Sequence, residues 1–211
     1  MSRTSLVTTT ASADRLERLI RARLEPGADK ERIDAHIWDL FGEDWAVMFT
    51  DLSGFSRRVA EFGIIHFLQV IYESERILIP IIEEHDGILL KVEGDSFLVI
   101  FRNAQKALQC SIAMQASLEK ANVGRAPENR ILLCVGLGAG AMLRIGDADV
   151  FGAEVNAASK LGEDTAKAGE ILVTDAFRAR CQGEGGVEWE ALAEAPPGAT
   201  GAWRANYKVG K

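Results

Sequence analysis

Apolar residues follow two patterns along this chain: a spacing of three to four positions in some segments, and short unbroken runs in others. The first pattern predicts helices, over residues 13–24, 29–41, 57–85, 104–122, 152–166 and 175–181. The second predicts strands, over residues 46–51, 88–92, 96–101, 131–143, 170–174, 188–192 and 203–209. The helical pattern of 57–85 is interrupted at Phe62-Gly63, and Pro80 favours a kink in it. This alternation predicts an α/β sandwich built on a mixed β-sheet, with flanking helices.

The strand runs 88–92 and 96–101 are joined by Glu93-Gly94-Asp95. A short link that contains glycine predicts a central β-hairpin with Asp95 at its tip. The two N-terminal helices precede all of this, so we expect a helical extension over 1–44 and one domain over 45–211. The apolar faces of the extension either cover part of the domain or bind a regulatory partner, and we expect covering.

The composition of the chain argues against several classes of function. The chain has 211 residues, a net charge of −7 and no basic cluster, which argues against nucleic-acid binding. Its longest apolar stretch, Ile131–Leu143, is too short and too rich in glycine to cross a membrane. Residues 1–14 lack an apolar signal core, and the widely spaced Cys110, Cys134 and Cys181 suggest reduced thiols. We therefore expect a cytoplasmic protein with no membrane span.

The first strand ends in the carboxylate of Asp51, and a turn of Ser53, Gly54, Phe55 and Ser56 follows before a helical pattern begins. A carboxylate beside the free N–H groups of a helix start suits a divalent cation held together with a phosphate. The commoner use of such an aspartate is to cap the helix. Taken alone, the segment leaves both interpretations open.

The hairpin segment KVEGDSF, which runs from Lys91 to Phe97, favours the first interpretation. Asp95 at the hairpin tip lies beside Asp51 if the two strands are neighbours. Paired carboxylates of this kind can hold two divalent ions bridged by a triphosphate. An ordinary hairpin also places Asp and Gly at its tip, for turn reasons alone.

A third motif begins at Asp149 and continues into a predicted helix that contains Asn156 and Lys160. These last two residues are four positions apart and share one helix face. An acceptor, an amide and a cation that converge in this way suit recognition of a purine and a phosphate. For each residue taken separately, a capping Asn156 and a solvated Lys160 explain the pattern as well.

Gly136, Gly138 and Gly140 form the segment GLGAG, which resembles part of a dinucleotide-binding fingerprint. The spacing differs from that fingerprint, and no helix follows at once. These glycines therefore predict a strand that packs closely against its neighbours.

Together, FTDLSGFS, KVEGDSF and DVFGAEVNAASK resemble the catalytic domain of class III nucleotidyl cyclases, over roughly residues 45–211. The resemblance implies that Asp51 and Asp95 bind divalent metal ions (Mg²⁺, Mn²⁺ or Ca²⁺). It implies that Lys91 and Asp149 select adenine, because guanylyl cyclases of the family usually carry Glu and Cys at these positions. ATP is the implied nucleotide.

The same resemblance assigns further roles. The backbone of Ser53–Ser56 would hold the triphosphate, and Asn156 would orient the ribose. Arg204 falls at the position of a triphosphate-binding lysine in the last strand, and Arg144 would add a phosphate contact. The implied reaction is attack of the ribose 3′-oxygen on the α-phosphorus, with release of pyrophosphate.

Two features depart from the family pattern. Lys160 stands where the family has an arginine that stabilises the transition state, and an ammonium cannot form the two-pronged contact of a guanidinium. The link from Gly140 to Asp149 is several residues shorter than the arm through which two catalytic domains dimerise. Each active site of the family needs residues from both domains, so a chain without this arm does not complete its site.

We therefore expect a monomer that binds ATP and a divalent metal, with weak or no cyclase turnover. The alternative is an active homodimeric adenylyl cyclase in which Lys160 suffices. A diguanylate cyclase would fit the hairpin, but not Lys91, Asp149 and Asn156.

Overall fold

The computed structural model describes residues 11–54, 60–181 and 186–208 of the chain. Its helices are α1 (Ala11–Leu24), α2 (Lys30–Phe41), α4 (Ile64–Glu84), α5 (Ala104–Ala121), α6 (Ala153–Ser159) and α7 (Asp175–Arg180). Its strands are β1 (Gly42–Leu52), β2 (Ile88–Glu93), β3 (Ser96–Phe101), β4 (Leu133–Ile145), β5 (Asp149–Phe151), β6 (Ile171–Thr174), β7 (Val187–Ala191) and β8 (Ala202–Tyr207). The predicted strands are confirmed within the described residues, with shifted ends.

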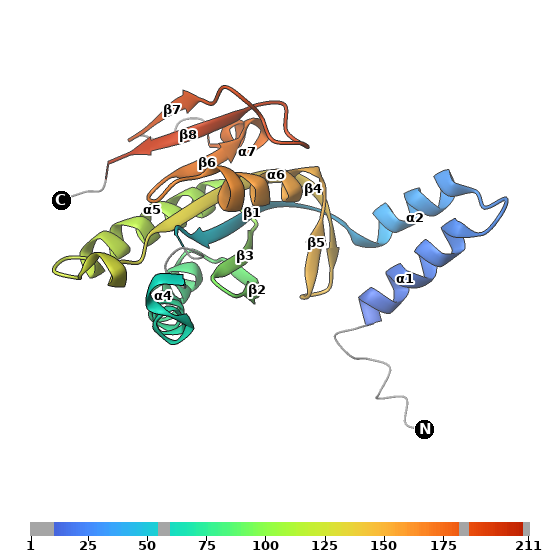
Figure 1. The fold of residues 1–211 in the computed structure, drawn as a ribbon. Coiled ribbons are helices and arrows are strands. Elements are labelled where there is room, and N and C mark those ends of the chain that lie inside the picture. Colours follow the sequence, from blue (N-terminus) through green and yellow to red (C-terminus); the bar gives the residue numbers. More distant parts are fainter. Residues whose placement is uncertain (1–10, 55–59, 182–185, 209–211) are drawn as a thin grey trace.

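One mixed sheet contains these strands, in the order β2-β3-β1-β4-β6-β8-β7, with β5 paired to β4 (Figure 1). β4 and β6 run parallel, and the other described neighbours run antiparallel. β1 lies between β3 and β4 and pairs with β4 over its full length. The sheet, its central β2–β3 hairpin and the flanking helices confirm the predicted fold class.

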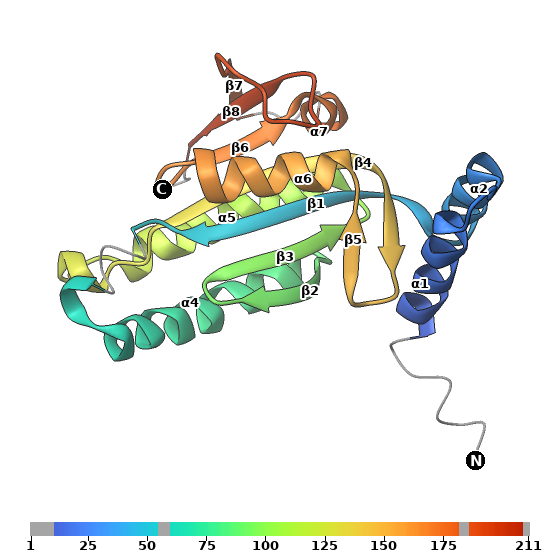
Figure 2. The same ribbon diagram turned by 45° about the vertical axis from the view of Figure 1, so that its right-hand side comes forward.

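The helices cover the two faces of the sheet unequally (Figure 2). α4, α5 and α7 bury one face around residues such as Met48 and Val99. α6 covers the other face, where Val47 and Ile100 lie. Because side chains alternate along a strand, every second residue of β1 faces α6.

The glycines of β4 allow α6 to approach the sheet very closely. A Cβ atom on Gly136 would lie 2.1 Å from the Ala158 carbonyl oxygen, and one on Gly138 would lie 2.5 Å from that of Glu154. The prediction of a strand pressed against its neighbours is confirmed.

The helix predicted over 152–166 is only partly correct. α6 ends at Ser159, and a π-helical turn follows over Lys160–Thr165. Gly162 in this turn packs against β1, because a Cβ atom there would lie 2.9 Å from the Phe49 carbonyl oxygen. Helical spacing in the sequence does not distinguish a π-turn from a continued α-helix.

The link predicted between Gly140 and Asp149 is instead a β-hairpin. β4 continues to Ile145, and β5 pairs back on it, with Ile145 opposite Asp149. The prediction ended the strand two residues early, although Ile145 is buried against the N-terminal helices.

The N-terminal helices stand at one end of the sheet and cover neither of its faces (Figures 1 and 2). They pack against each other and against Leu143 and Ile145 of the β4–β5 hairpin. α1 has no buried residue, and Leu24 and Trp38 are 76% and 46% exposed. The expectation that the pair covers part of the domain is confirmed at the β4–β5 hairpin. α2 ends at Phe41, and β1 begins at the next residue.

The break predicted at Phe62-Gly63 is confirmed, since α4 begins after Gly63, which has a φ of +85°. Pro80 lies inside α4 and does not end it. No helix in the described ranges has both the length and the apolar character that a membrane crossing requires.

Candidate functional site

Asp51 and Asp95 lie together at one end of β1. Asp95 occupies the two-residue turn between β2 and β3, in which Gly94 takes the positive φ of +62° that tight hairpins favour. The Phe97 backbone N–H donates to Thr50 Oγ1 over 3.1 Å and ties this hairpin to β1. The Leu52 backbone N–H favours the ionised form of both carboxylates, so the two groups lie near the same backbone dipole.

The surroundings of the two carboxylates oppose their ionisation. Burial raises the pKa of Asp51 to about 6, and the negative charges of Asp95 and Glu163 contribute. Burial also raises the pKa of Asp95, with a smaller contribution from Glu163. Asp95 Oδ2 is buried and has no hydrogen-bond partner.

This donor set fits a divalent cation. Carboxylate oxygens are the ligands that Mg²⁺, Mn²⁺ and Ca²⁺ prefer. The unpaired Oδ2 of Asp95 is such an oxygen, and it has no hydrogen-bond partner that would compete with a cation. In the described part of the chain, no three or more His, Cys, Asp or Glu side chains converge as closely as metal ligands do. Asp51 and Asp95 would therefore hold the cation with water or with a phosphate group.

A stability test follows from the raised pKa of Asp51. The folded protein binds more protons than the unfolded chain between pH 4 and pH 6, so stability falls as the pH rises through this window. If the pKa of a carboxyl rises from 3.8 in the unfolded chain to about 6 in the folded protein, its ionisation lowers the free energy of unfolding by about 3 kcal/mol. Asp51 is half-buried, and solvent screening reduces this penalty to about 1 kcal/mol.

We expect Asp51→Asn to raise the melting temperature of the metal-free protein by about 2–4 °C at pH 7 and to leave it nearly unchanged at pH 4. Thermal melts in EDTA at both pH values measure this. Asp39→Asn, on the exposed side of α2, is the control and should change neither value. Equal shifts at the two pH values would show that ionised Asp51 carries no such penalty.

Lys91 and Asp149 form the second feature of the site. Lys91 Nζ lies 2.5 Å from Asp149 Oδ2, and both side chains are about one-third exposed. The register of β2 shifts between Leu89 and Lys91, so Leu90 is a bulge. Without this bulge, Lys91 would point to the opposite face of the sheet. Instead it pairs with Leu98 on the α6 side, where it meets Asp149.

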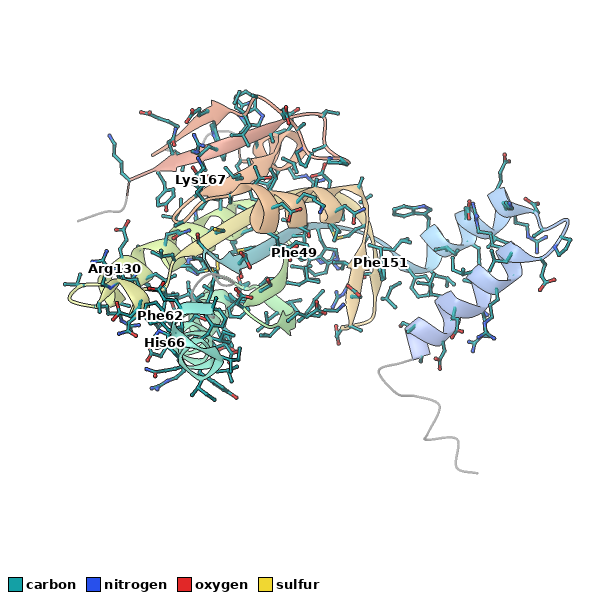
Figure 3. The ribbon with its side chains drawn as sticks, viewed as in Figure 1. Phe49, Phe62, His66, Arg130, Phe151 and Lys167 are labelled. Atoms are coloured by element: carbon teal, nitrogen blue, oxygen red, sulfur yellow. The ribbon has the colours of Figure 1, made fainter. Side chains whose placement is uncertain are left out.

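A cavity of about 110 Å³ connects these features. It is lined by Phe49, Lys91, Glu93, Ser96, Phe97, Leu98, Asp149 and Glu163. Ser96 links it to the aspartate pair, since its Oγ lies 3.5 Å from Asp51 Oδ1. Figure 3 shows Phe49 on the sheet beneath α6.

The sequence analysis missed Phe49 and Glu163. Phe49 precedes Asp51 by two positions and therefore lies on the same face of β1. This spacing is visible in the sequence and could have predicted that Phe49 lies near the site. An aromatic ring beside a Lys–Asp pair is suited to a planar base. Glu163 reaches the cavity from the π-turn, and helical spacing gave no sign of it.

Asn156 and Lys160 lie outside the lining of this cavity. Both side chains are exposed, the first on α6 and the second at the start of the π-turn. Lys160 Nζ forms an ion pair with Asp164 over 2.6 Å. Within one chain, the two predicted catalytic residues do not meet the aspartate pair.

Arg144 and Arg204 are also distant from Asp51. Arg144 lies beyond the start of β1, about 30 Å along the strand from Asp51 at the usual rise per residue. It stacks over Trp45 and bonds to Asp147. Arg204 is three strands away on β8, where it pairs with Glu190 at 2.9 Å and Glu170 at 3.1 Å. Neither guanidinium reaches the aspartate pair within one chain.

The predicted phosphate-binding turn is described only in part. The Ser53 backbone N–H donates to the Leu132 carbonyl over 2.8 Å and is therefore not free for a phosphate. Gly54 has a φ of +85°, as a tight turn requires. Phe55 and Ser56 lie outside the described residues.

The sheet order, the close packing of α6 on the glycines of β4 and the carboxylate pair at the end of β1 define an α/β domain of the nucleotide cyclase type. Residues 42–195 match the family described as the adenylate and guanylate cyclase catalytic domain, and the chain belongs to this family. The sequence resemblance to class III cyclases is therefore confirmed.

Curated relatives are much longer than this chain. Serine/threonine-protein kinase pkn2 of Myxococcus xanthus is 31% identical over 134 residues, which cover 64% of this chain and 16% of the kinase. Putative adenylate cyclase 3 of Rhizobium meliloti (strain 1021) is 27% identical over 144 residues, which cover 68% of this chain and 24% of that protein. The match therefore concerns a single module of each relative.

Solved structures share the fold. The adenylate/guanylate cyclase/hydrolase from Silicibacter pomeroyi aligns with a TM-score of 0.66 and 22% identity, over 78% of this chain and 96% of that one. The adenylyl cyclase CyaB from P. aeruginosa aligns with a TM-score of 0.66 and 18% identity, over 79% and 95% of the two chains. At these identities the likeness concerns the fold alone.

Proposed function

We propose that this protein binds ATP together with a divalent cation and converts it to cAMP weakly or not at all. The observation that carries the proposal is the pair of carboxylates, Asp51 and Asp95, which lie together at the end of β1, where the charge of Asp95 helps to raise the pKa of Asp51. The buried and unpaired oxygen of Asp95 supports a cation as the missing partner.

A divalent cation bound at this pair would neutralise the charge of a triphosphate. Asp51 and Asp95 would hold the cation, and Thr50 would keep the hairpin that bears Asp95 against β1. Class III cyclase domains generally use divalent metals, which agrees with this assignment. Without a cation, two ionised carboxylates repel a triphosphate.

The base would bind at the cavity beside Lys91 and Asp149. An ammonium and a carboxylate held 2.5 Å apart supply a donor and an acceptor for the edge of adenine, and Phe49 supplies an apolar wall. The cavity of about 110 Å³ is smaller than the roughly 300–1,000 Å³ of typical ligand pockets. One chain therefore offers only part of a nucleotide site.

Three features support weak turnover. Lys160 replaces a guanidinium by a point charge, and it already pairs with Asp164. Asn156 and Lys160 point to solvent, outside the cavity of their own chain. The β4–β5 hairpin packs its Ile145 against the N-terminal helices of the same chain, which favours a monomer.

The alternative is an active homodimeric adenylyl cyclase. One observation favours it: the Lys160–Asp164 pair is exposed, and such pairs contribute about 0–1 kcal/mol. A phosphate of a nucleotide bound to a second chain would displace Asp164 at little cost.

Nucleotide choice tests the proposed function. We expect calorimetry to show that ATP binds with Mn²⁺ present and that chelation of the metal weakens this binding strongly. We expect GTP to bind at least tenfold more weakly than ATP, because Lys91 and Asp149 suit the donor and acceptor of adenine. Lys91→Met should remove the preference, whereas Lys106→Met, on α5, should keep it. Equal affinity for ATP and GTP would mean that the Lys91–Asp149 pair does not contact the base.

A further inference from the structure

Glu163 lies at the aspartate pair although it belongs to a distant part of the chain. It is the fourth residue of the π-turn that follows α6, and Gly162 before it packs directly on the Phe49 carbonyl of β1. Its side chain lines the same cavity as Phe49 and Ser96. Ser96 in turn contacts Asp51, so Glu163 faces the carboxylates across this cavity.

One oxygen of Glu163 is held in place. Ser159 Oγ donates to Glu163 Oε2 over 2.7 Å. This bond restrains the side chain from the preceding turn of helix and leaves its other oxygen for a different partner. Its negative charge acts on both Asp51 and Asp95.

Among the described residues, the cations nearest to Glu163 form their ion pairs with other carboxylates. Lys91 lies among the described residues that line the cavity, and it is paired with Asp149 at 2.5 Å. Lys160 begins the π-turn, and it is paired with Asp164. Within the described part of the chain, Asp51, Asp95 and Glu163 therefore leave an excess of negative charge at this end of the sheet.

We propose that Glu163 is a third acidic residue of the metal site, which strengthens binding of the divalent cation and makes binding of the nucleotide depend on it. Glu163 acts through space rather than as a direct ligand, because the described acidic side chains do not form a three-residue metal cluster. The negative charge of Glu163 attracts the cation and repels a triphosphate that carries no metal. Binding of the cation and binding of the nucleotide therefore strengthen each other. The inference rests on the proposed function, since it needs the Asp51–Asp95 pair to hold the ion.

Binding of Mn²⁺ in the absence of nucleotide tests the inference. The full chain is titrated with MnCl₂, and free Mn²⁺ is followed by electron paramagnetic resonance. We expect Glu163→Gln to raise the Kd for Mn²⁺ about tenfold, the order of effect that one charge has on a nearby divalent ion in a largely aqueous surrounding. Glu163→Asp should keep most of the affinity. Asp164→Asn, on the same π-turn but paired with Lys160, is the matched control and should change the Kd less than about twofold.

A second measurement examines the nucleotide. We expect Glu163→Gln to strengthen binding of ATP in EDTA, so that the ratio of the ATP Kd without and with Mn²⁺ falls about tenfold. A loss of packing alone would weaken binding under both conditions and would leave this ratio unchanged.

The outcomes separate the inference from the proposed function. If Asp51→Asn abolishes Mn²⁺ binding and Glu163→Gln leaves the Kd unchanged, the inference is wrong and the aspartate site stands. If the unmodified protein binds no Mn²⁺, the proposed function fails and the inference fails with it. An equal loss of affinity in Glu163→Gln and Asp164→Asn would show a general effect of the π-turn and would also contradict the inference.

Discussion

Asp95→Asn is expected to weaken metal-dependent binding of ATP by about 100-fold or more, and Asp51→Asn is expected to do the same. The side chains keep their size, but each loses the ionised oxygen that a divalent cation requires. The proximity of the two carboxylates and the unpaired Oδ2 of Asp95 are the reasons to expect that both act on one ligand. Calorimetry with ATP and Mn²⁺ measures the effect.

Asp39→Asn is the control for both variants, because Asp39 is exposed on α2 and lies outside the site. Circular dichroism should show that all three variants fold. Full affinity in both Asp51→Asn and Asp95→Asn would rule out a site built on two carboxylates. Loss of affinity in only one would place the cation on that residue alone.

The second large effect concerns turnover. We expect negligible cAMP formation by the unmodified protein in an assay with Mn²⁺, together with a monomer by light scattering. In other phosphoryl transfers, an arginine that stabilises the transition state contributes about 10³–10⁵ in rate. Lys160 neutralises charge but cannot bond to two oxygens at once.

Lys160→Arg alone should restore little activity, because the exposed position of this residue requires a second chain to bring it to the nucleotide. Lys167→Arg, seven residues further along, is the matched control for the added guanidinium. Robust activity of the unmodified protein that rises with its concentration, as dimers form, would establish the active homodimer instead.

The sequence was sufficient to bring Asp51 and Asp95 together because local rules determine their positions. A buried strand that ends at Asp51 and a two-residue hairpin that presents Asp95 are both visible as patterns, and antiparallel pairing of β1 with β3 brings them together. The glycines of β4 were also interpreted correctly, since a strand without side chains allows a close neighbour.

The remaining features depend on geometry that these patterns do not contain. The bulge at Leu90 moves Lys91 to the α6 side of the sheet, and the apolar run of β2 looks the same with or without it. The π-turn changes which residues share a face, so Glu163 could not be placed from helical spacing. The apolar stripe of the N-terminal helices indicates that something is buried there, but not that the partner is Ile145 of the β4–β5 hairpin.

α1 buries little apolar surface, and this affects local unfolding of the protein. A segment with no buried side chain loses little packing energy when it detaches, so α1 forms a cooperative unit whose opening free energy lies well below that of the sheet. α2 is held by Ile37 and Phe41 and continues directly into β1, so it should remain with the sheet longer than α1. Thermal fluctuation therefore exposes Leu16 and Leu19 while the aspartate pair stays in place.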